Sequence, residues 1–191
     1  MYRTRTVSVM LVCGLLLPAA AFTRAYVALD AARPAVAMPE RAALPWRNAS
    51  WLNADSPVTL ESLRGRVVLL NFWVFTCGNC QRTIPSLKTF DAAFRAKGLT
   101  IIGIHTPEFP PYAGEHSKRN VQEAIERYGI RYPVAQDNDN ATWNLYQIRY
   151  WPSLVLIDKR GMIRFEDYGE FHVGDDHHKE WERRIAALLA E

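Results

Sequence analysis

Hydrophobic residues in the middle of the chain form two continuous runs with a helical pattern between them. The runs at 67–73 (VVLLNFW) and 99–105 (LTIIGIH) are typical of central strands that are covered on both faces. Between them, apolar residues recur at the spacing of one helix face and end before a Lys-Gly pair; they are Ile84, Leu87, Phe90 or Ala93, and Phe94. The pattern therefore predicts a strand, a helix and a second strand in succession.

The alternation of strands and helices continues to the C-terminus. A polar loop over 106–118 precedes a predicted helix. We expect this helix to have Asn120 as its N-cap and Glu123 as the reciprocal capping residue, and to end at Gly129. The remaining predicted elements are a strand at 132–135, a short helix at 142–146, two strands at 153–157 and 163–168 joined by a turn, and a final helix with Trp181, Ile185 and Leu188 on one face. This order predicts an α/β fold with a mainly parallel sheet and an antiparallel edge.

Residues 1–25 have the pattern of an export signal or a membrane anchor. Arg3 and Arg5 precede an apolar run over 7–22, and small residues at A-x-A spacing, 19–21, lie near its end. The run is somewhat short for a membrane span, which needs about 17–25 residues. A cleaved signal peptide and a retained N-terminal anchor are therefore both open. Either one places the rest of the chain outside the cytoplasm, in the periplasm or cell envelope, as a secreted or anchored protein.

A linker and one domain are expected to follow this leader. Residues 26–45 are rich in Ala and Pro and show no sustained period, which is typical of a linker. Residues 46–191 have the length of a single domain. The net charge of +3 comes with no basic stripe that carries interleaved aromatic residues, so we expect no nucleic-acid partner.

The cysteines indicate chemistry rather than stapling. Cys13 lies in the leader, which leaves Cys77 and Cys80 in the predicted domain. A structural disulfide between them would close so short a loop that it would restrain the unfolded chain only weakly. A zinc site would need two more ligands, and none of the five histidines has ligand spacing relative to the pair. We therefore expect no metal site here.

The position of the two cysteines predicts a redox pair. Cys77 follows a buried strand, and Cys80 falls in the first turn of the next helix. The free N–H groups and the positive dipole end of a helix favour a thiolate, so Cys77 is expected to have a lowered pKa and to act as the nucleophile. Cys80, one turn further on, can resolve a mixed disulfide. We predict a thiol–disulfide oxidoreductase with no cofactor beyond the redox-active Cys77–Cys80 disulfide.

Three segments support this prediction by resemblance. They are NFWVFTCGNCQRTIP from Asn71, GIHTPEF from Gly103, and YPVAQDNDNATWNLYQIRYWP from Tyr132. Together they resemble the thioredoxin superfamily, in particular its exported TlpA/ResA-like branch and the thioredoxin-like domain associated with DipZ/CcdA-type proteins. The resemblance covers roughly residues 50–170. It implies a thioredoxin-like fold, with a central mixed sheet flanked by helices and an extra α-β insertion between the CxxC helix and a cis-proline.

The resemblance also implies roles for three further residues. Pro152 would be the cis-proline that faces the cysteines and leaves a backbone edge free for a substrate peptide. Trp151, directly before it, and Trp73 would bind or position substrates. The implied partners are disulfide-containing exported proteins and a membrane thiol electron carrier of DipZ/CcdA type.

The chain departs from the family pattern at three positions. Asn71 stands where many thioredoxins carry a buried acid, and Thr83 stands where ResA-like proteins carry a glutamate. Glu108 is then the candidate proton carrier. Asn79 places no cation between the cysteines, which favours a reductant over a strong oxidant. A disulfide-donating oxidase or isomerase, and a copper metallochaperone that uses the same cysteines, are the alternatives.

Overall fold

The computed structural model describes residues 41–110 and 114–191. The predicted leader and the first part of the predicted linker lie outside the described residues. The described elements, in chain order, are β1 (Arg41–Ala42), β2 (Trp51–Leu52), η1 (Glu61–Leu63), β3 (Val67–Trp73), α2 (Gly78–Phe94), η2 (Arg95–Lys97), β4 (Leu99–His105), α3 (Lys118–Tyr128), β5 (Val134–Gln136), α4 (Ala141–Leu145), β6 (Ser153–Ile157), β7 (Met162–Tyr168) and α5 (Asp176–Ala190).

The described strands form one mixed sheet in the order β1-β7-β6-β3-β4-β5-β2. Only the β3–β4 and β4–β5 pairs are parallel. The β3–β6, β6–β7, β1–β7 and β2–β5 pairs are antiparallel. The expectation of a mainly parallel sheet was therefore wrong, because the β6–β7 hairpin pairs with β3 in the reverse direction and two short strands add to the edges. The mixed sheet implied by the resemblance is confirmed.

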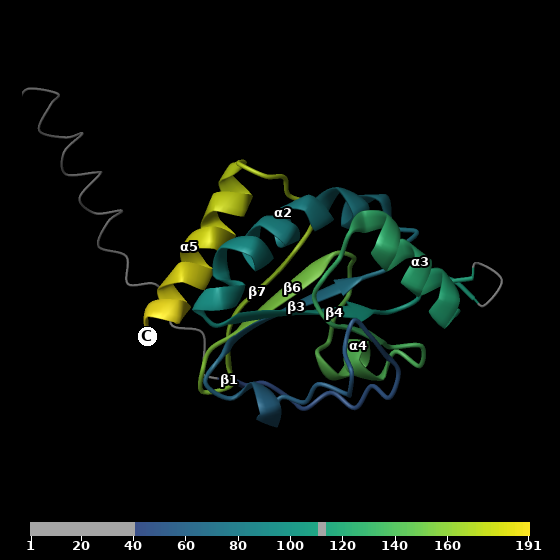
Figure 1. Cartoon of the computed structure of the whole chain (residues 1–191), viewed down its shortest axis with the longest axis horizontal. Helices are drawn as coiled ribbons and strands as arrows, with labels where there is room; N and C mark the ends of the chain where they lie inside the picture. The colour runs from purple at the N-terminus through teal and green to yellow at the C-terminus, as the bar shows by residue number, and fades with distance from the viewer. Residues whose placement is uncertain (1–40, 111–113) are drawn as a thin grey trace, which may run out of the picture. The chain divides into compact units, whose positions relative to one another are not determined.

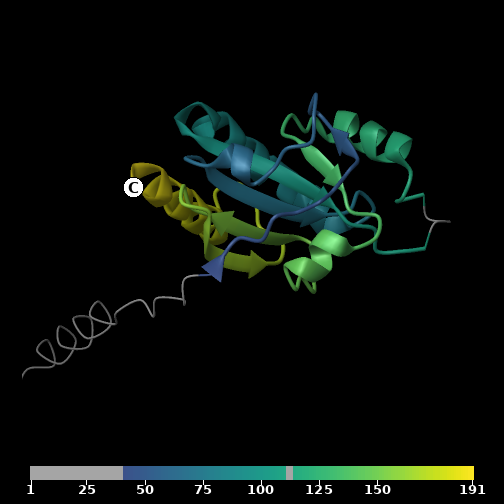
Figure 2. The same cartoon turned by 90° about the horizontal axis from the view of Figure 1, so that it is seen from below.

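Both faces of the sheet are covered, as the continuous apolar run of β3 predicted. Val67, Leu69 and Trp73 belong to the apolar core on the side of α2, α3 and α5. Val68 and Phe72 belong to a second core, which the segment before β3 and α4 complete. Figure 1 shows α2, α3 and α5 on one side of the sheet, with α4 and the segment before β3 on the other. Figure 2 shows this segment running across the sheet.

The cap of α3 differs from the prediction. The helix begins at Lys118, and Ser117 is its N-cap, since the Ser117 hydroxyl accepts a hydrogen bond from the Asn120 N–H. The Asn120 side chain instead donates to the Gly114 carbonyl at 3.0 Å. Glu123 forms an ion pair with Arg119 rather than a reciprocal cap. Both Ser and Asn are good N-caps, so the sequence offered two starts three residues apart.

The sheet extends into the segment predicted as linker. Arg41 and Ala42 pair with β7, and the Ala43 N–H donates to the Gly161 carbonyl at 2.9 Å. Residues 41 and 42 are too few and too weakly apolar to predict a strand from the sequence. Their pairing depends on the edge of β7, which is distant in the chain. Among the described helices, none has the length and hydrophobicity needed to cross a bilayer.

Candidate active site

Cys77 is the N-cap residue of α2, as its position in the sequence predicted. Its sulfur accepts a hydrogen bond from the Cys80 N–H at 3.2 Å, the contact that a Ser or Asp side chain makes at an ordinary helix start. Cys77 is partly exposed, whereas Cys80, in the first turn, is only 1% exposed. The two are free thiols whose sulfurs lie 2.6 Å apart, with the Cys80 thiol donating to Cys77. One sulfur is thus accessible and the other lies behind it.

The two thiols have opposite pKa shifts. The hydrogen bond from the Cys80 thiol lowers the pKa of Cys77 to about 7, and the backbone N–H groups of Cys80 and Asn79 add to it. Partial burial and the negative charge of Glu108 act in the opposite direction. Burial strongly raises the pKa of Cys80, and its role as donor to Cys77 adds to this effect. The thiolate of the pair therefore resides on Cys77.

The turn between β3 and α2 is held from several sides. The Phe75 N–H donates to Nε2 of His105 at 3.3 Å, and the Phe75 ring stacks on the His105 ring. The Phe75 carbonyl accepts from the Gln81 amide at 2.8 Å and from the Tyr128 hydroxyl at 3.3 Å. His105 is fully buried, and burial lowers its pKa to about 3, so it is a neutral acceptor at physiological pH.

The Trp151–Pro152 peptide bond is cis, as the resemblance implied. Pro152 is buried, and its carbonyl accepts from the Gly169 N–H at 2.9 Å. Trp151 is half-buried and stacks on Trp143, with ring centroids 4.0 Å apart. Its indole N–H donates to the Thr106 carbonyl at 3.2 Å. The stacking and the hydrogen bond therefore fix the orientation of the Trp151 ring, which packs against the same apolar core as Cys77.

Trp73 requires a correction. It is fully buried and lies edge-on to His105, with ring centroids 5.2 Å apart. Direct binding of a substrate by Trp73 is therefore excluded in this structure, because the last residue of a central strand is covered by a helix. Its remaining contribution is to the position of His105, which in turn holds the turn before Cys77.

The two positions where the family pattern places acids contain no titrating group. Asn71 is buried in β3, on the same side of the sheet as α2, opposite Gly103 of the neighbouring strand. Thr83 is also buried, and its hydroxyl donates to the Asn79 carbonyl at 3.0 Å. The Glu108 side chain is exposed, yet its charge acts on both cysteines and raises the pKa of each. Glu108 is thus the acid that the structure places near the pair.

Two residues near the site were not found from the sequence. Arg82 donates to the Asn79 side chain at 2.6 Å and forms two hydrogen bonds to the Glu170 carboxylate. The prediction from Asn79 concerned only the residues between the cysteines, whereas Arg82 comes two residues after Cys80; Glu170 balances the Arg82 charge. Glu115 is the second, a fully buried carboxylate in what reads as a polar loop. The sequence carries no signal for its burial, because Glu115 precedes α3 and so lies outside the apolar periodicity of that helix.

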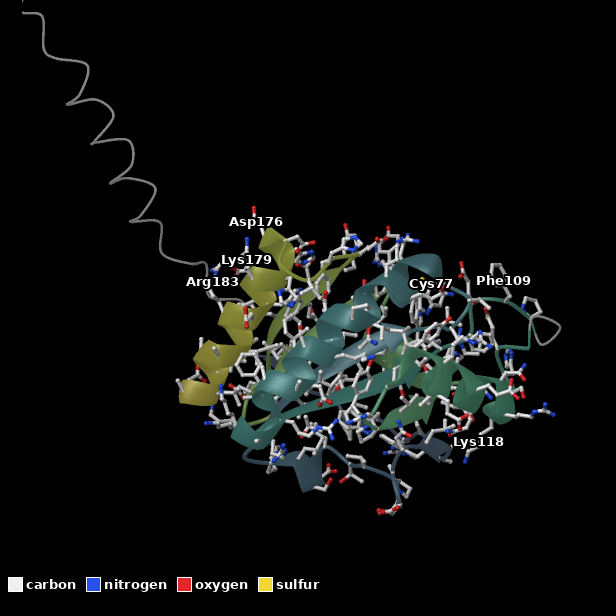
Figure 3. The ribbon with its side chains drawn as sticks, turned by 45° about the horizontal axis from the view of Figure 1, so that its top comes forward. Cys77, Phe109, Lys118, Asp176, Lys179 and Arg183 are labelled. Carbon is white, nitrogen blue, oxygen red and sulfur yellow. The ribbon has the colours of Figure 1, made fainter. Side chains whose placement is uncertain are left out.

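Within residues 41–110 and 114–191, no group of three or more His, Cys, Asp or Glu side chains is placed to hold a metal ion. Figure 3 shows Cys77 at the start of α2 and Phe109 in the loop after β4, at the same end of the domain. Asp176, Lys179 and Arg183 lie along α5, away from this end. The cysteine pair, the cis-proline loop and the loop after β4 therefore form the candidate active site.

Known proteins are similar to this chain in sequence and in fold. The model of the AhpC/TSA family matches residues 40–166. Protein DipZ of Mycobacterium bovis is 47% identical over 122 residues, which are 63% of this chain and 17% of DipZ. The thiol-disulfide oxidoreductase ResA of Geobacillus thermodenitrificans is 30% identical over 105 residues, 55% of this chain and 56% of ResA. The crystal structure of a thioredoxin-like superfamily protein superposes with a TM-score of 0.69 at 28% identity and covers 78% of this chain and 97% of its own.

The chain thus spans about a sixth of the length of the DipZ protein and about half that of ResA. The fold agrees with that of the solved structure. The chain belongs to the AhpC/TSA family, has a thioredoxin-like fold and is similar to proteins of the TlpA/ResA-like branch.

Proposed function

We propose that this protein is an exported thiol–disulfide oxidoreductase, which reduces disulfides in other exported proteins through Cys77 and Cys80. The observation that carries the proposal is the inequality of the pair. Cys77 is accessible with a pKa lowered to about 7, and Cys80 is buried behind it with a raised pKa. A nucleophile needs access and thiolate character, whereas a resolving thiol needs only proximity to its partner.

The reaction proceeds in two exchanges. The Cys77 thiolate attacks one sulfur of the substrate disulfide, which forms a mixed disulfide and releases the other substrate sulfur as a thiolate. Cys80 loses its proton and attacks the Cys77 sulfur, which releases the second substrate thiolate and leaves a Cys77–Cys80 disulfide. Two electrons pass to the substrate. Glu108, whose charge acts on both sulfurs, is the proposed carrier of the Cys80 proton to solvent.

The pKa of Cys77 is lowered only moderately, to about 7, which supports the reducing direction. A lower thiol pKa stabilises the reduced form and makes a pair more oxidising. The nucleophilic cysteine titrates at about 7 in thioredoxin and at about 3.5 in the strong oxidant DsbA. The value of about 7 for Cys77 lies with thioredoxin. The ion pair between Arg82 and Glu170 agrees with this, since Glu170 offsets the positive charge that Arg82 would otherwise direct at the thiolate.

Export and the electron source rest on the sequence and on one relative. Residues 1–25 have the composition of a signal or anchor. The match to part of DipZ supports a membrane thiol carrier of DipZ/CcdA type, which would return two electrons to the Cys77–Cys80 disulfide. The proposed substrates are disulfide-containing proteins outside the cytoplasm.

Substitution of the resolving cysteine tests this function. Cys80→Ser keeps the Cys77 nucleophile but blocks the second exchange, so we expect a stable mixed disulfide with the substrate. The species should appear on a non-reducing gel and disappear with dithiothreitol. Cys77→Ser is the matched control and should trap nothing. The proposal fails if Cys80→Ser traps no protein and the wild-type pair shows no reversible oxidation.

The reduction potential tests the direction. We expect a value closer to that of thioredoxin, about −270 mV, than to that of DsbA, about −120 mV. Equilibration of the purified protein with glutathione or dithiothreitol buffers, followed by alkylation and mass spectrometry, gives the value. A potential near that of DsbA would replace the reductant by a disulfide-donating oxidase.

A further inference from the structure

The loop after β4 contains a carboxylate that has no place in the exchange chemistry. Glu115 is 0% exposed, although a buried carboxylate costs free energy unless hydrogen bonds or charges compensate it. Its partners are three donors from two segments. One carboxylate oxygen accepts from the Thr76 hydroxyl, and the other accepts from the N–H groups of Glu108 and Phe109 at 2.7 and 2.8 Å. The carboxylate therefore bridges the turn before Cys77 and the loop that carries Glu108.

The two bridged segments depend on Glu115 to different degrees. The turn before Cys77 has its own fixation, because Phe75 is held by His105, Gln81 and Tyr128. Within the described residues, the hydrogen bonds of Glu108 and Phe109 are those to Glu115. Loss of the carboxylate should therefore release the loop more than the turn.

The loop matters to the active site because of Glu108. The Glu108 charge acts on both cysteines, an effect that falls with distance and with exposure to solvent. We propose that Glu115 is a positioning residue: its buried carboxylate ties Glu108 and Phe109 to the turn before Cys77 and so keeps the Glu108 carboxylate at the end of the domain where the two sulfurs lie. This inference rests on the proposed function of the pair and adds the element that sets its electrostatic surroundings.

A double-mutant cycle tests the tie. Glu108→Gln removes the charge, and Glu115→Leu removes the acceptors that hold the loop. In each single variant the midpoint of Cys77 alkylation against pH should fall by ~0.3–0.5 pH units, about a twofold to threefold gain in thiolate at pH 6. In the Glu108→Gln background, Glu115→Leu should add no further shift, because the charge it positions is already gone.

Conservative variants separate position from charge. Glu115→Gln keeps an oxygen for the two N–H groups and an amide for the Thr76 hydroxyl, so its midpoint should stay at the wild-type value. Glu123→Gln, which removes an exposed carboxylate on α3, is the matched control and should also leave the midpoint unchanged. If Glu115→Leu does not fold, Glu115→Asp takes its place in the cycle, since its carboxylate is one methylene too short to span both segments.

The inference is overturned if Glu115→Leu, or Glu115→Asp in its place, leaves the midpoint of Cys77 alkylation at the wild-type value. It is also overturned if the shift is equally large in the Glu108→Gln background, or if Glu115→Gln lowers the midpoint as much as Glu115→Leu does. These outcomes differ from a failure of the proposed function. That failure would appear in the wild-type protein as a Cys77 midpoint equal to that of free cysteine, or as the absence of a trapped species with Cys80→Ser.

Discussion

At the scale of single residues, the chemistry of this protein depends on two sulfurs with opposite surroundings. Cys77 takes the place of a capping side chain, so the N–H groups of the first helical turn point at its sulfur. Cys80 belongs to the apolar core and can reach only its partner. One motif thereby supplies an ionised nucleophile and a protonated resolving thiol, because burial disfavours a charge at one position while hydrogen bonds favour it at the other.

Alkylation of the reduced protein checks this division. We expect the rate of Cys77 modification by iodoacetamide to rise with pH to a plateau with a midpoint of about 7. The sign follows from the lowered pKa, because the thiolate reacts and is present above the pKa. Cys80 should stay unmodified in the folded protein and react after denaturation. Peptide mass spectrometry separates the two sites; a midpoint near that of free cysteine at Cys77 would contradict the prediction.

At the scale of elements, helix α2 presents the cysteines, and its position depends on its neighbours on the same face of the sheet. Trp181 and Ile185 of α5 share one apolar core with Leu87 and Phe90 of α2. The Asp175 side chain caps α5 by accepting from the His178 N–H at 2.7 Å. The packing of α5 against α2 therefore helps to hold α2, and with it the two cysteines, in position.

Because of this shared core, truncation of a buried α5 side chain should lower the stability of the protein. Ile185 is fully buried, and Ile185→Ala is expected to lower the free energy of unfolding by about 2–5 kcal/mol. Glu182→Ala, at an exposed position of the same helix, should change it by less than about 0.5 kcal/mol. Urea unfolding followed by tryptophan fluorescence measures both. Equal stability of the two variants would show that α5 contributes little to the core.

At the scale of the whole molecule, the sheet extends into the segment before residue 46 that the composition predicts as linker. The sheet includes Arg41 and Ala42, and Arg41 forms an ion pair with Glu166 of β7. The Leu44 carbonyl accepts from the hydroxyl of the buried Tyr146 at 2.6 Å. These contacts join residues 41–44 to β7 and to Tyr146 at the end of α4, which are more than a hundred residues away.

Truncation measures what this segment contributes. A polypeptide of residues 41–191 should unfold in one cooperative transition. One of residues 46–191 should be less stable by about 1–3 kcal/mol, because it loses the β1 pairing and leaves the Tyr146 hydroxyl without its acceptor. The comparison uses urea unfolding at the same pH. Identical midpoints would mean that the domain begins at Trp46, as the composition of the chain predicts.

The amino-acid order alone determined the strands at 67–73 and 99–105, and the helix start between them at which Cys77 and Cys80 lie. Periodicity, spacing and helix-end electrostatics are properties of neighbouring residues, so they can be read without knowledge of the fold. The tertiary structure decided the direction of the sheet pairings, the burial of Trp73 and of Glu115, and the entry of Arg41 and Ala42 into the sheet. Each of these depends on contacts between segments distant in the chain. The sequence suggests that Glu115, in a polar loop, is solvated, but donors from the turn before Cys77 and from the start of the same loop bury its carboxylate.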